Sequence, residues 1–410
     1  MINAAKASAK NSVQSSGVFI IKAVITTKPL RILTRDFELV GEVDGYTSAI
    51  ITRRWHGLDE LDIVVNRYMS GADELLRGRY IVIGGDLHKA FEIRHREIEL
   101  DDKGKQSENW RIKALGLKSV LSRLMTIPPP DKEYDRILAD AESVMKHYVD
   151  TNAISGSPQR KLPNLVIAPN LNRGNTVEWQ SRYMNLSEEI SNISELSGLG
   201  WNISVDYVNK RMVFDVMEGR NLVASQSDLP PVIFSPKLDS LRSIEYVSSD
   251  LNYRNVVYVA GAGEGVDRRV IVIGDAEGYD RHELFVDARD IQETENIDGE
   301  DVPIPEDVVI ARLTARGMQK LAESSQEEYL SAQNLTNSPF TYEKDYDLGD
   351  IVTVRNDDWG IGMDARITEV KEIYEAGKPF QVEVTFGKDK PTFMDVIKKE
   401  FSGIQPEMRR

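Results

Sequence analysis

The stretch "SAIITRRWHGLDELDIVVN", Ser48–Asn66, contains two β-strand patterns separated by a turn. Before the turn at 56–57 the stretch contains three consecutive β-branched residues, Ile50–Thr52, and after it Leu61, Ile63 and Val65 alternate with residues on the opposite face of the strand. Such a period of two places one face of a strand against a core and leaves the other face open. The stretch therefore predicts an antiparallel hairpin.

The same pattern extends over residues 29–126. Short alternating runs are separated by turn residues, at 44–45, at 84–85 and in "DDKGK" at 101–105. Short strands at hairpin spacing are typical of an antiparallel sandwich or barrel. Residues 17–127 therefore predict a first β-barrel domain, which part of 210–245 is expected to complete.

Helical spacing begins after "IPPP" at 127–130. It predicts a helix over about 134–150 and a second helix that is capped by Asn185 and closed by Gly198. A hairpin that turns at 209–210 is expected to follow. Residues 128–220 therefore predict an α+β insert domain.

Strand patterns resume in the C-terminal half of the chain. They predict the first part of a second β-barrel domain over 240–300 and its last part over 341–392, where "DYDLGDIVTV" begins the final set of strands. Between them, 301–340 is expected to form a helical insert whose helix starts near Pro305. The expected fold class is α+β and mainly β, with two antiparallel β-barrel domains, the α+β insert and the helix-containing insert.

Residues 1–16 are expected to form a flexible N-terminal arm, and 393–410 a C-terminal tail. The start of the chain lacks the apolar run of a signal peptide, and no apolar stretch approaches the roughly 20 residues of a membrane span. We therefore expect synthesis in the host cytoplasm and no membrane insertion.

Composition excludes several classes of function. The 410 residues carry a net charge of −15, which argues against tight wrapping of nucleic acid but not against a surface that DNA slides past. There is no cysteine, so disulfides, thiolate metal sites and a cysteine nucleophile are excluded.

No motif indicates catalysis, a cofactor or a metal. "GAGEG" at 261–265 lacks the ending of a phosphate loop and is expected to be a hairpin loop. His88, Glu92 and His95 lie on an alternating strand, where they do not share one face. The acid-rich segment 275–290 fits a solvated surface better than a catalytic or calcium site. We predict no catalytic, cofactor-binding or metal-binding residue.

One basic and aromatic cluster is a candidate partner interface, because arginine and tryptophan are enriched in interfaces. Its members are Arg53, Arg54, Trp55, Arg77 and Arg79. The alternative is that these are strand residues whose aliphatic stems cover the edge of a core.

The order of several motifs resembles the phage tail hub family, which siphophage tail tips and prophage tail-like particles share. "SAIITRRWHGLDELDIVVN" followed by "LLRGRYIVIGG" resembles the family's opening barrel, and "WRIKALGLKSVLSRLM" its next block. "GLGWNISVDYVNKRMVFDVMEGRN" resembles its later hairpin, and "YDLGDIVTV" with "VEVTFG" resembles its close. The resemblance covers roughly residues 30–388.

This resemblance implies a virion protein at the tail tip, similar to the hub of contractile tails. There, three copies form a ring, and two tube-like barrels per copy match a sixfold tube. The implied partners are two further copies of the chain, the tail tube or distal tail protein, the tape-measure protein, and tip or fibre proteins. DNA would pass without specific binding, and no enzyme activity is implied.

Two other functions are open from the sequence. One is a cell-wall glycan hydrolase that uses the acidic segment 275–290, with Asp280 and Glu283 as its carboxylates. The other is a module that binds host-wall carbohydrate through exposed aromatic residues such as Trp201 or Trp359.

Overall fold

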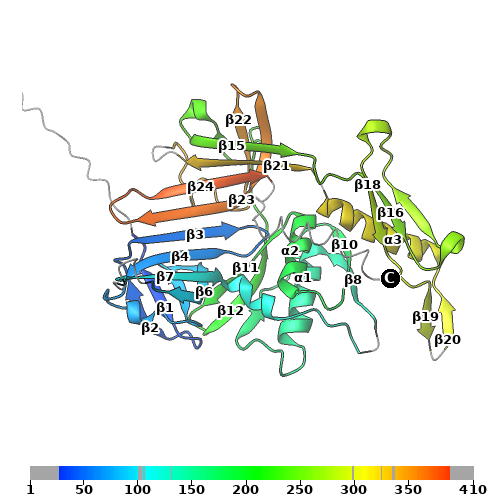
Figure 1. Ribbon diagram of the computed structural model, residues 1–410, viewed down its shortest axis with the longest axis horizontal. Helices are drawn as coiled ribbons and strands as arrows, with labels where there is room; N and C mark the ends of the chain where they lie inside the picture. The colour runs from blue at the N-terminus through cyan, green and yellow to red at the C-terminus, as the bar shows by residue number, and fades with distance from the viewer. Residues whose placement is uncertain are drawn as a thin grey trace, which may run out of the picture.

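The structure is a computed structural model that describes residues 27–99, 104, 107–130, 132–297, 300–324, 326–334 and 338–387. The predicted arm at 1–16, the predicted tail at 393–410 and most of the predicted tip at 101–105 lie outside these residues. Figure 1 shows three regions: a large sheet, a central α+β region, and a small unit beside α3.

A 14-stranded sheet dominates the fold. Its first half contains, in spatial order, β3 (Ser48–Arg54), β4 (Glu60–Asn66), β7 (Asn109–Gly116), β6 (Asp86–Glu97), β5 (Tyr80–Ile83), β1 (Leu30–Leu33) and β2 (Leu39–Val43). Its second half contains β23 (Ile361–Glu375), β24 (Gln381–Gly387), β21 (Glu327–Asn334) and β15 (Leu241–Ser249). β22 (Ile351–Asn356) pairs with β23 and also, in parallel, with the short strands β13 (Asn221–Leu222) and β14 (Ile233–Phe234).

The two halves join directly where β23 pairs antiparallel with β3, with Ile373 opposite Ile50 and Glu369 opposite Arg54. In Figure 1 the orange β23 therefore lies beside the blue β3. The predicted mainly β, α+β fold is confirmed, but the two β regions share one sheet, and the described strand pairs close neither half into a barrel. The domain boundaries given by the sequence stay predictions.

The segment 210–245 does not pair with the first half of the sheet. Its first part, β12 (Arg211–Met217), pairs with β11 (Gly200–Asp206) in the central region. Its later strands β13, β14 and β15 pair with β22 and β21, which belong to the second half. The described pairs therefore do not include one between this segment and the first half of the sheet, and completion of the first β region by part of 210–245 stays a prediction.

Each half of the sheet covers its own hydrophobic core. In the first half the inward residues of β3 and β4, among them Ile51, Leu61 and Ile63, are buried. In the second half Phe234 packs against Tyr346 and Phe386, with ring centroids 5.0 and 5.1 Å apart. On β3 and β4, buried residues alternate strictly with partly exposed ones. One face of these strands therefore packs against the core, and the opposite face is accessible to solvent.

The central region contains β8 (Asp135–Asp140), α1 (Ala141–Val149), β9 (Leu165–Ile167), β10 (Thr176–Ser181), α2 (Leu186–Ser197), β11 and β12. Asn185 caps α2 by accepting hydrogen bonds from the amides of Ser187 and Glu188, and Gly198 ends it at φ +74°. This helix and the β11–β12 hairpin confirm the prediction. The helix predicted over about 134–150 is wrong in its first half, which forms β8 and pairs with β10.

A small unit contains β16 (Val256–Ala260), β17 (Val270–Ile273), β18 (Glu283–Asp287), α3 (Glu306–Glu323) and the hairpin of β19 (Thr294–Ile297) with β20 (Glu300–Pro303). α3 packs on the sheet β17-β16-β18 through Val309 and Leu313. It approaches closely at Gly317, where an added Cβ would lie 2.5 Å from Ile273. The helix begins after Pro305, as predicted.

Within the described ranges, no helix has the length and apolar character that crossing a membrane would require.

Candidate functional site

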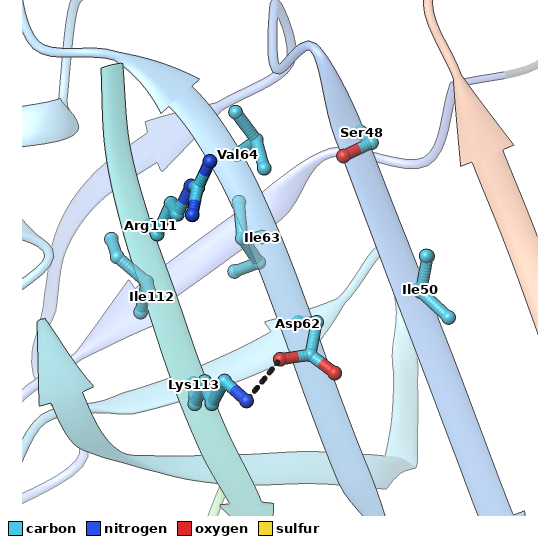
Figure 2. Close-up of a pocket in the computed structure, with 8 residues that line it drawn as sticks. All are labelled: Ser48, Ile50, Asp62, Ile63, Val64, Arg111, Ile112 and Lys113. Carbon is cyan, nitrogen blue, oxygen red and sulfur yellow. Dashed lines mark ion pairs between the residues drawn. The ribbon is translucent and has the colours of Figure 1, made fainter. Parts of the chain in front are cut away.

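The candidate site is the open face of the large sheet, the face turned away from both cores. It is formed by alternate residues of β23, β3, β4 and β7. Figure 2 shows a shallow hollow on this face, where Ile50, Asp62, Val64, Arg111 and Lys113 project from β3, β4 and β7. The hollow is lined by aliphatic side chains together with the charged residues Asp62, Arg111 and Lys113.

Ion pairs across neighbouring strands hold the cations of the open face. Lys113 pairs with Asp62 at 3.9 Å, and Lys371 on β23 pairs with Glu383 on β24 at 3.2 Å. These positions are direct neighbours in the strand register.

Arg54 is held more firmly than the other cations of this face. Its guanidinium reaches Glu369 at 2.8 Å and Glu60 at 3.0 Å. Burial lowers the pKa of Arg54, but the two carboxylates outweigh burial and raise it overall. The open face thus neutralises its own positive charge.

In its described part the large sheet has open backbone edges at both terminal strands, β15 and β2, which pairs with β1 only, and along part of β6. β15 pairs with β21 on one side only. On β6, pairing with β5 ends at Glu92 and the backbone bonds to 78–79 end at Ile93, so Arg94–Glu97 pair with β7 alone. Unpaired strand edges are templates for strand addition by another chain.

The five predicted interface residues do not form one exposed cluster. Arg53 is 8% exposed, forms an ion pair with Asp347 at 3.1 Å and donates to the Tyr342 hydroxyl at 2.8 Å. Trp55 is 2% exposed. The side chains of Arg53 and Trp55 are therefore buried and make their contacts with other parts of the same chain.

The remaining members lie nearer the solvent. Arg79 donates to the carbonyl oxygen of Glu74 and also pairs with its carboxylate, and Arg77 is exposed. Arg54 belongs to the open face described above. Contact of this cluster with a partner stays a prediction.

Trp55 joins three parts of the chain. Its indole Nε1 donates to the carbonyl oxygen of Gly198 at 3.0 Å, and Arg366 lies 5.6 Å from its ring. A Cβ added at Gly200 or at Gly349 would lie 2.5 or 2.1 Å from that ring. The glycine of the C-terminal "LGD", Gly349, is therefore required because the indole ring of Trp55 leaves no room for a side chain there.

A buried ion pair also holds the two sheet halves together. Lys89 on β6 and Glu372 on β23 are both almost completely buried, 2.5 Å apart. The hydroxyls of Tyr342 and Tyr374 donate to the same carboxylate at 3.0 and 2.9 Å. Because a buried charge needs partners, this network fixes how β6 faces β23. Nothing in the local sequence signals it, since its members lie far apart in the chain.

The other sequence candidates are not assembled into a site. "GAGEG" connects the antiparallel strands β16 and β17, which confirms the hairpin loop. Across the described ranges, no group of three or more His, Asp or Glu residues is placed to hold a metal ion.

In the acidic segment 275–290, the candidate carboxylate Glu283 is paired with a neighbouring arginine. Glu283 pairs with Arg281 at 2.6 Å, and this hydrogen bond lowers the pKa of Glu283. A general acid for hydrolysis needs the opposite shift. Trp201 is fully buried and donates to the carbonyl oxygen of His56, whereas Trp359 is 52% exposed. Trp201 therefore cannot stack on a sugar.

Comparison with solved structures identifies the fold. The 43 kDa tail protein of prophage MuSo2 from Shewanella oneidensis aligns with a TM-score of 0.53 and 11% identity, over 88% of this chain and 98% of that protein. The tail protein from Neisseria meningitidis MC58 aligns with a TM-score of 0.50 and 13% identity, over 89% and 97%. The chain therefore has the fold of these prophage tail proteins.

A component of the E. coli type VI secretion system, described as structurally similar to T4 bacteriophage tail proteins, aligns with a TM-score of 0.41 and 10% identity, over 88% of this chain and 77% of that one. No curated protein matches the sequence.

One family model, described as Siphovirus ReqiPepy6 Gp37-like protein, matches residues 29–388. The chain therefore belongs to the Siphovirus ReqiPepy6 Gp37-like protein family.

Proposed function

We propose that the chain is a structural hub of a phage or phage-like tail tip, and that three copies form a ring. The ring joins the tail tube or distal tail protein on one side to tip or fibre proteins on the other. The tape-measure protein and DNA pass through its bore. Family membership and the fold shared with prophage tail proteins support a place in the tail.

One observation carries the ring. The two sheet halves form one continuous sheet through the β23–β3 pair, and within the described residues unpaired backbone remains at the terminal strands β15 and β2 and at Arg94–Glu97 of β6. Pairing of β15 in one copy with β6 of the next copy continues the sheet from copy to copy. Such a head-to-tail contact closes into a ring when the rotation between copies is a whole fraction of a turn.

The open face is suited to line the bore of this ring. Its cations Arg54, Lys113 and Lys371 are each held by carboxylates of neighbouring strands, and Arg111 lies 3.8 Å from the carboxylate of Glu99. Phosphates bind a protein mainly by displacing counterions from free lysine and arginine. A face with paired cations therefore lets DNA pass without holding it.

Electron microscopy of the purified chain and of tail tips, with the mass in solution, tests the proposal. We expect threefold rings and a mass of three copies at high concentration or in the assembled tip. Particles in which the chain is monomeric, or in which it forms no ring around the tail axis, would contradict it.

A further inference from the structure

Four arginines gather where α3 meets the strands β8 and β10 in the described structure. We call this cluster the arginine seam; it consists of Arg136, Arg182, Arg312 and Arg316. Arg136 lies on β8 directly opposite Gln180 of β10, and Arg312 and Arg316 follow one another on the same side of α3. A small hollow opens between the two elements, lined by Glu178, Trp179, Gln180, Arg312, Ala315, Arg316 and Gln319.

The seam has more positive charge than its own carboxylates balance. Only Asp290 and Glu178 are close to Arg136, and Asp290 is already paired with Arg316. Arg136 and Arg312 have no ion-pair partner among the described residues, and the buried Nε of Arg136 has no hydrogen-bond acceptor. Burial and the charge of Arg312 lower the pKa of Arg136. An unsatisfied buried donor is costly, so this arrangement favours an added anion.

The seam already shows which anion it accepts. The carboxylate of Asp290 receives hydrogen bonds from Arg316 at 2.9 and 3.3 Å and from Gln180 at 3.3 Å. Guanidinium groups bind planar carboxylates through two parallel hydrogen bonds. Arg136 and Arg312 offer the same chemistry beside Asp290, and their forks are unoccupied by any described residue.

A complementary surface lies on another part of the same chain. The loop between β17 and β18 carries Asp275, Glu277 and Asp280, which have no ion-pair partner within the described part of the chain. Tyr279 stands among them and is fully exposed. Near the seam, Leu138 is 68% exposed on the same side of β8 as Arg136. The loop thus offers carboxylates and an aromatic ring, and the seam offers arginines and an apolar side chain.

We propose that the arginine seam is a carboxylate-binding site, and that it receives the acidic β17–β18 loop of a second copy of this chain. The inference rests on the proposed multi-copy assembly and adds a contact outside the large sheet. Both surfaces are unpaired within one copy, and their charges are opposite although the chain as a whole carries −15. Charge complementarity of this kind fixes the register between subunits.

A mixture of two single-cysteine variants tests this contact by disulfide formation. Because the chain has no native cysteine, every disulfide that forms involves the introduced residues. One copy carries Gln319→Cys in the seam, and the other carries Ala276→Cys in the β17–β18 loop; neither change removes a charge. We expect a disulfide-linked pair under mild oxidation. The matched control replaces Ala276→Cys by Val266→Cys, a fully exposed position in the β16–β17 loop, and should give no linked pair.

Charge reversal gives the second test. Arg312→Glu alone and Glu277→Lys alone should each weaken self-association by about tenfold or more, and combining both changes in one chain should restore it, because every contact then carries the same pair of opposite charges with the two signs exchanged. Glu264→Lys, the same change in the β16–β17 loop, is the control and should have little effect. Circular dichroism checks that each variant is folded.

The outcomes separate this contact from the ring. If rings form normally but no linked pair appears and charge reversal has no effect, the proposed contact between the arginine seam and the β17–β18 loop is wrong. The proposal of a trimeric hub is not affected by that result. A linked pair and charge restoration without threefold rings would support the seam and count against the hub. A chain that stays monomeric and unlinked at all concentrations would overturn both.

Discussion

Trp55 and Gly349 show how single residues fix the arrangement of the chain. Gly349 has φ +92°, and an added Cβ would lie 2.1 Å from the indole ring. Gly360 has a similar φ of +67° but open space around it. Gly349→Ala should therefore cost about 2–5 kcal/mol of unfolding free energy, the sum of backbone strain and overpacking, whereas Gly360→Ala should cost only about 1–2 kcal/mol.

Urea unfolding of both variants measures this difference. Equal losses would mean that the left-handed backbone alone matters and that Trp55 moves aside easily. A larger loss at Gly349 would show that the tryptophan is fixed between Gly200 and Gly349.

His56 should make stability depend on pH. Burial, with the charges of Arg366 and Lys118, lowers its pKa to about 3, and its Nδ1 lies 2.7 Å from the hydroxyl oxygen of Ser194. The unfolded chain binds a proton at His56 below a pH of about 6.5, whereas the folded chain does not. The stabilisation is therefore complete above about pH 6.5 and is lost as pH falls toward 3.

The measurement is the unfolding free energy between pH 7 and pH 4 for the wild type and for His56→Gln. The wild type should lose up to about 1.4 kcal/mol more per pH unit than the variant. Val208→Ala, at an 89% exposed side chain without a titratable group, is the control and should keep the wild-type slope. Parallel curves for all three proteins would show that His56 titrates normally.

At the scale of elements, the sequence predicts whatever depends on neighbours in the chain. α2 is found because Asn185 and Gly198 mark its ends, and the β11–β12 hairpin because its strands alternate around one turn. β8 is missed because "YDRILADAESV" continues the helical spacing of α1 upstream. Its strand state depends on pairing with β10, about 40 residues later, which local propensity does not contain.

The contact between β6 and β23 depends on the buried pair of Lys89 and Glu372. Lys89→Met leaves Glu372 buried without its cation and should cost about 3–5 kcal/mol. Lys89→Met with Glu372→Gln should recover part of this loss, because the amide keeps an acceptor for Tyr342 and Tyr374 and carries no charge. Thermal or urea unfolding of the two variants measures the recovery.

A double variant no more stable than the single one would contradict this account, since it would place the cost in lost packing of the lysine stem. Lys113→Met is the matched control: its pair with Asp62 is exposed, so the change should cost less than about 1 kcal/mol.

At the scale of the whole molecule, the sequence indicates two β regions, but it does not predict that they pair to form one continuous sheet. β3 and β23 each show alternation, yet the pair that joins them links residues about 320 positions apart. The same limit applies to the candidate site. Arg53 and Trp55 were singled out by residue type, but burial against Asp347 and Gly349 is decided by tertiary packing. Composition predicts an acidic protein, and only the strand register shows that the open face pairs its own cations.

The paired cations lead to a prediction about DNA. If carboxylates keep Arg54, Lys113 and Lys371 from phosphate, removing these carboxylates should increase the affinity of the open face for duplex DNA. The variant combines four changes on the open face: Glu60→Gln, Asp62→Asn, Glu369→Gln and Glu383→Gln. With roughly three freed cations, its affinity for duplex DNA should fall about 40-fold between about 50 and 200 mM salt.

The control neutralises four exposed carboxylates elsewhere, so that the net charge changes equally: Asp228→Asn, Asp239→Asn, Asp250→Asn and Glu264→Gln. Fluorescence anisotropy with labelled duplex DNA compares both variants with the wild type across salt concentrations. Binding by the open-face variant alone means that local pairing, rather than total charge, keeps DNA from this surface. Equal binding by both variants would mean that the net charge of −15, rather than local ion pairing, repels DNA. That result would remove the argument that the open face lines the bore.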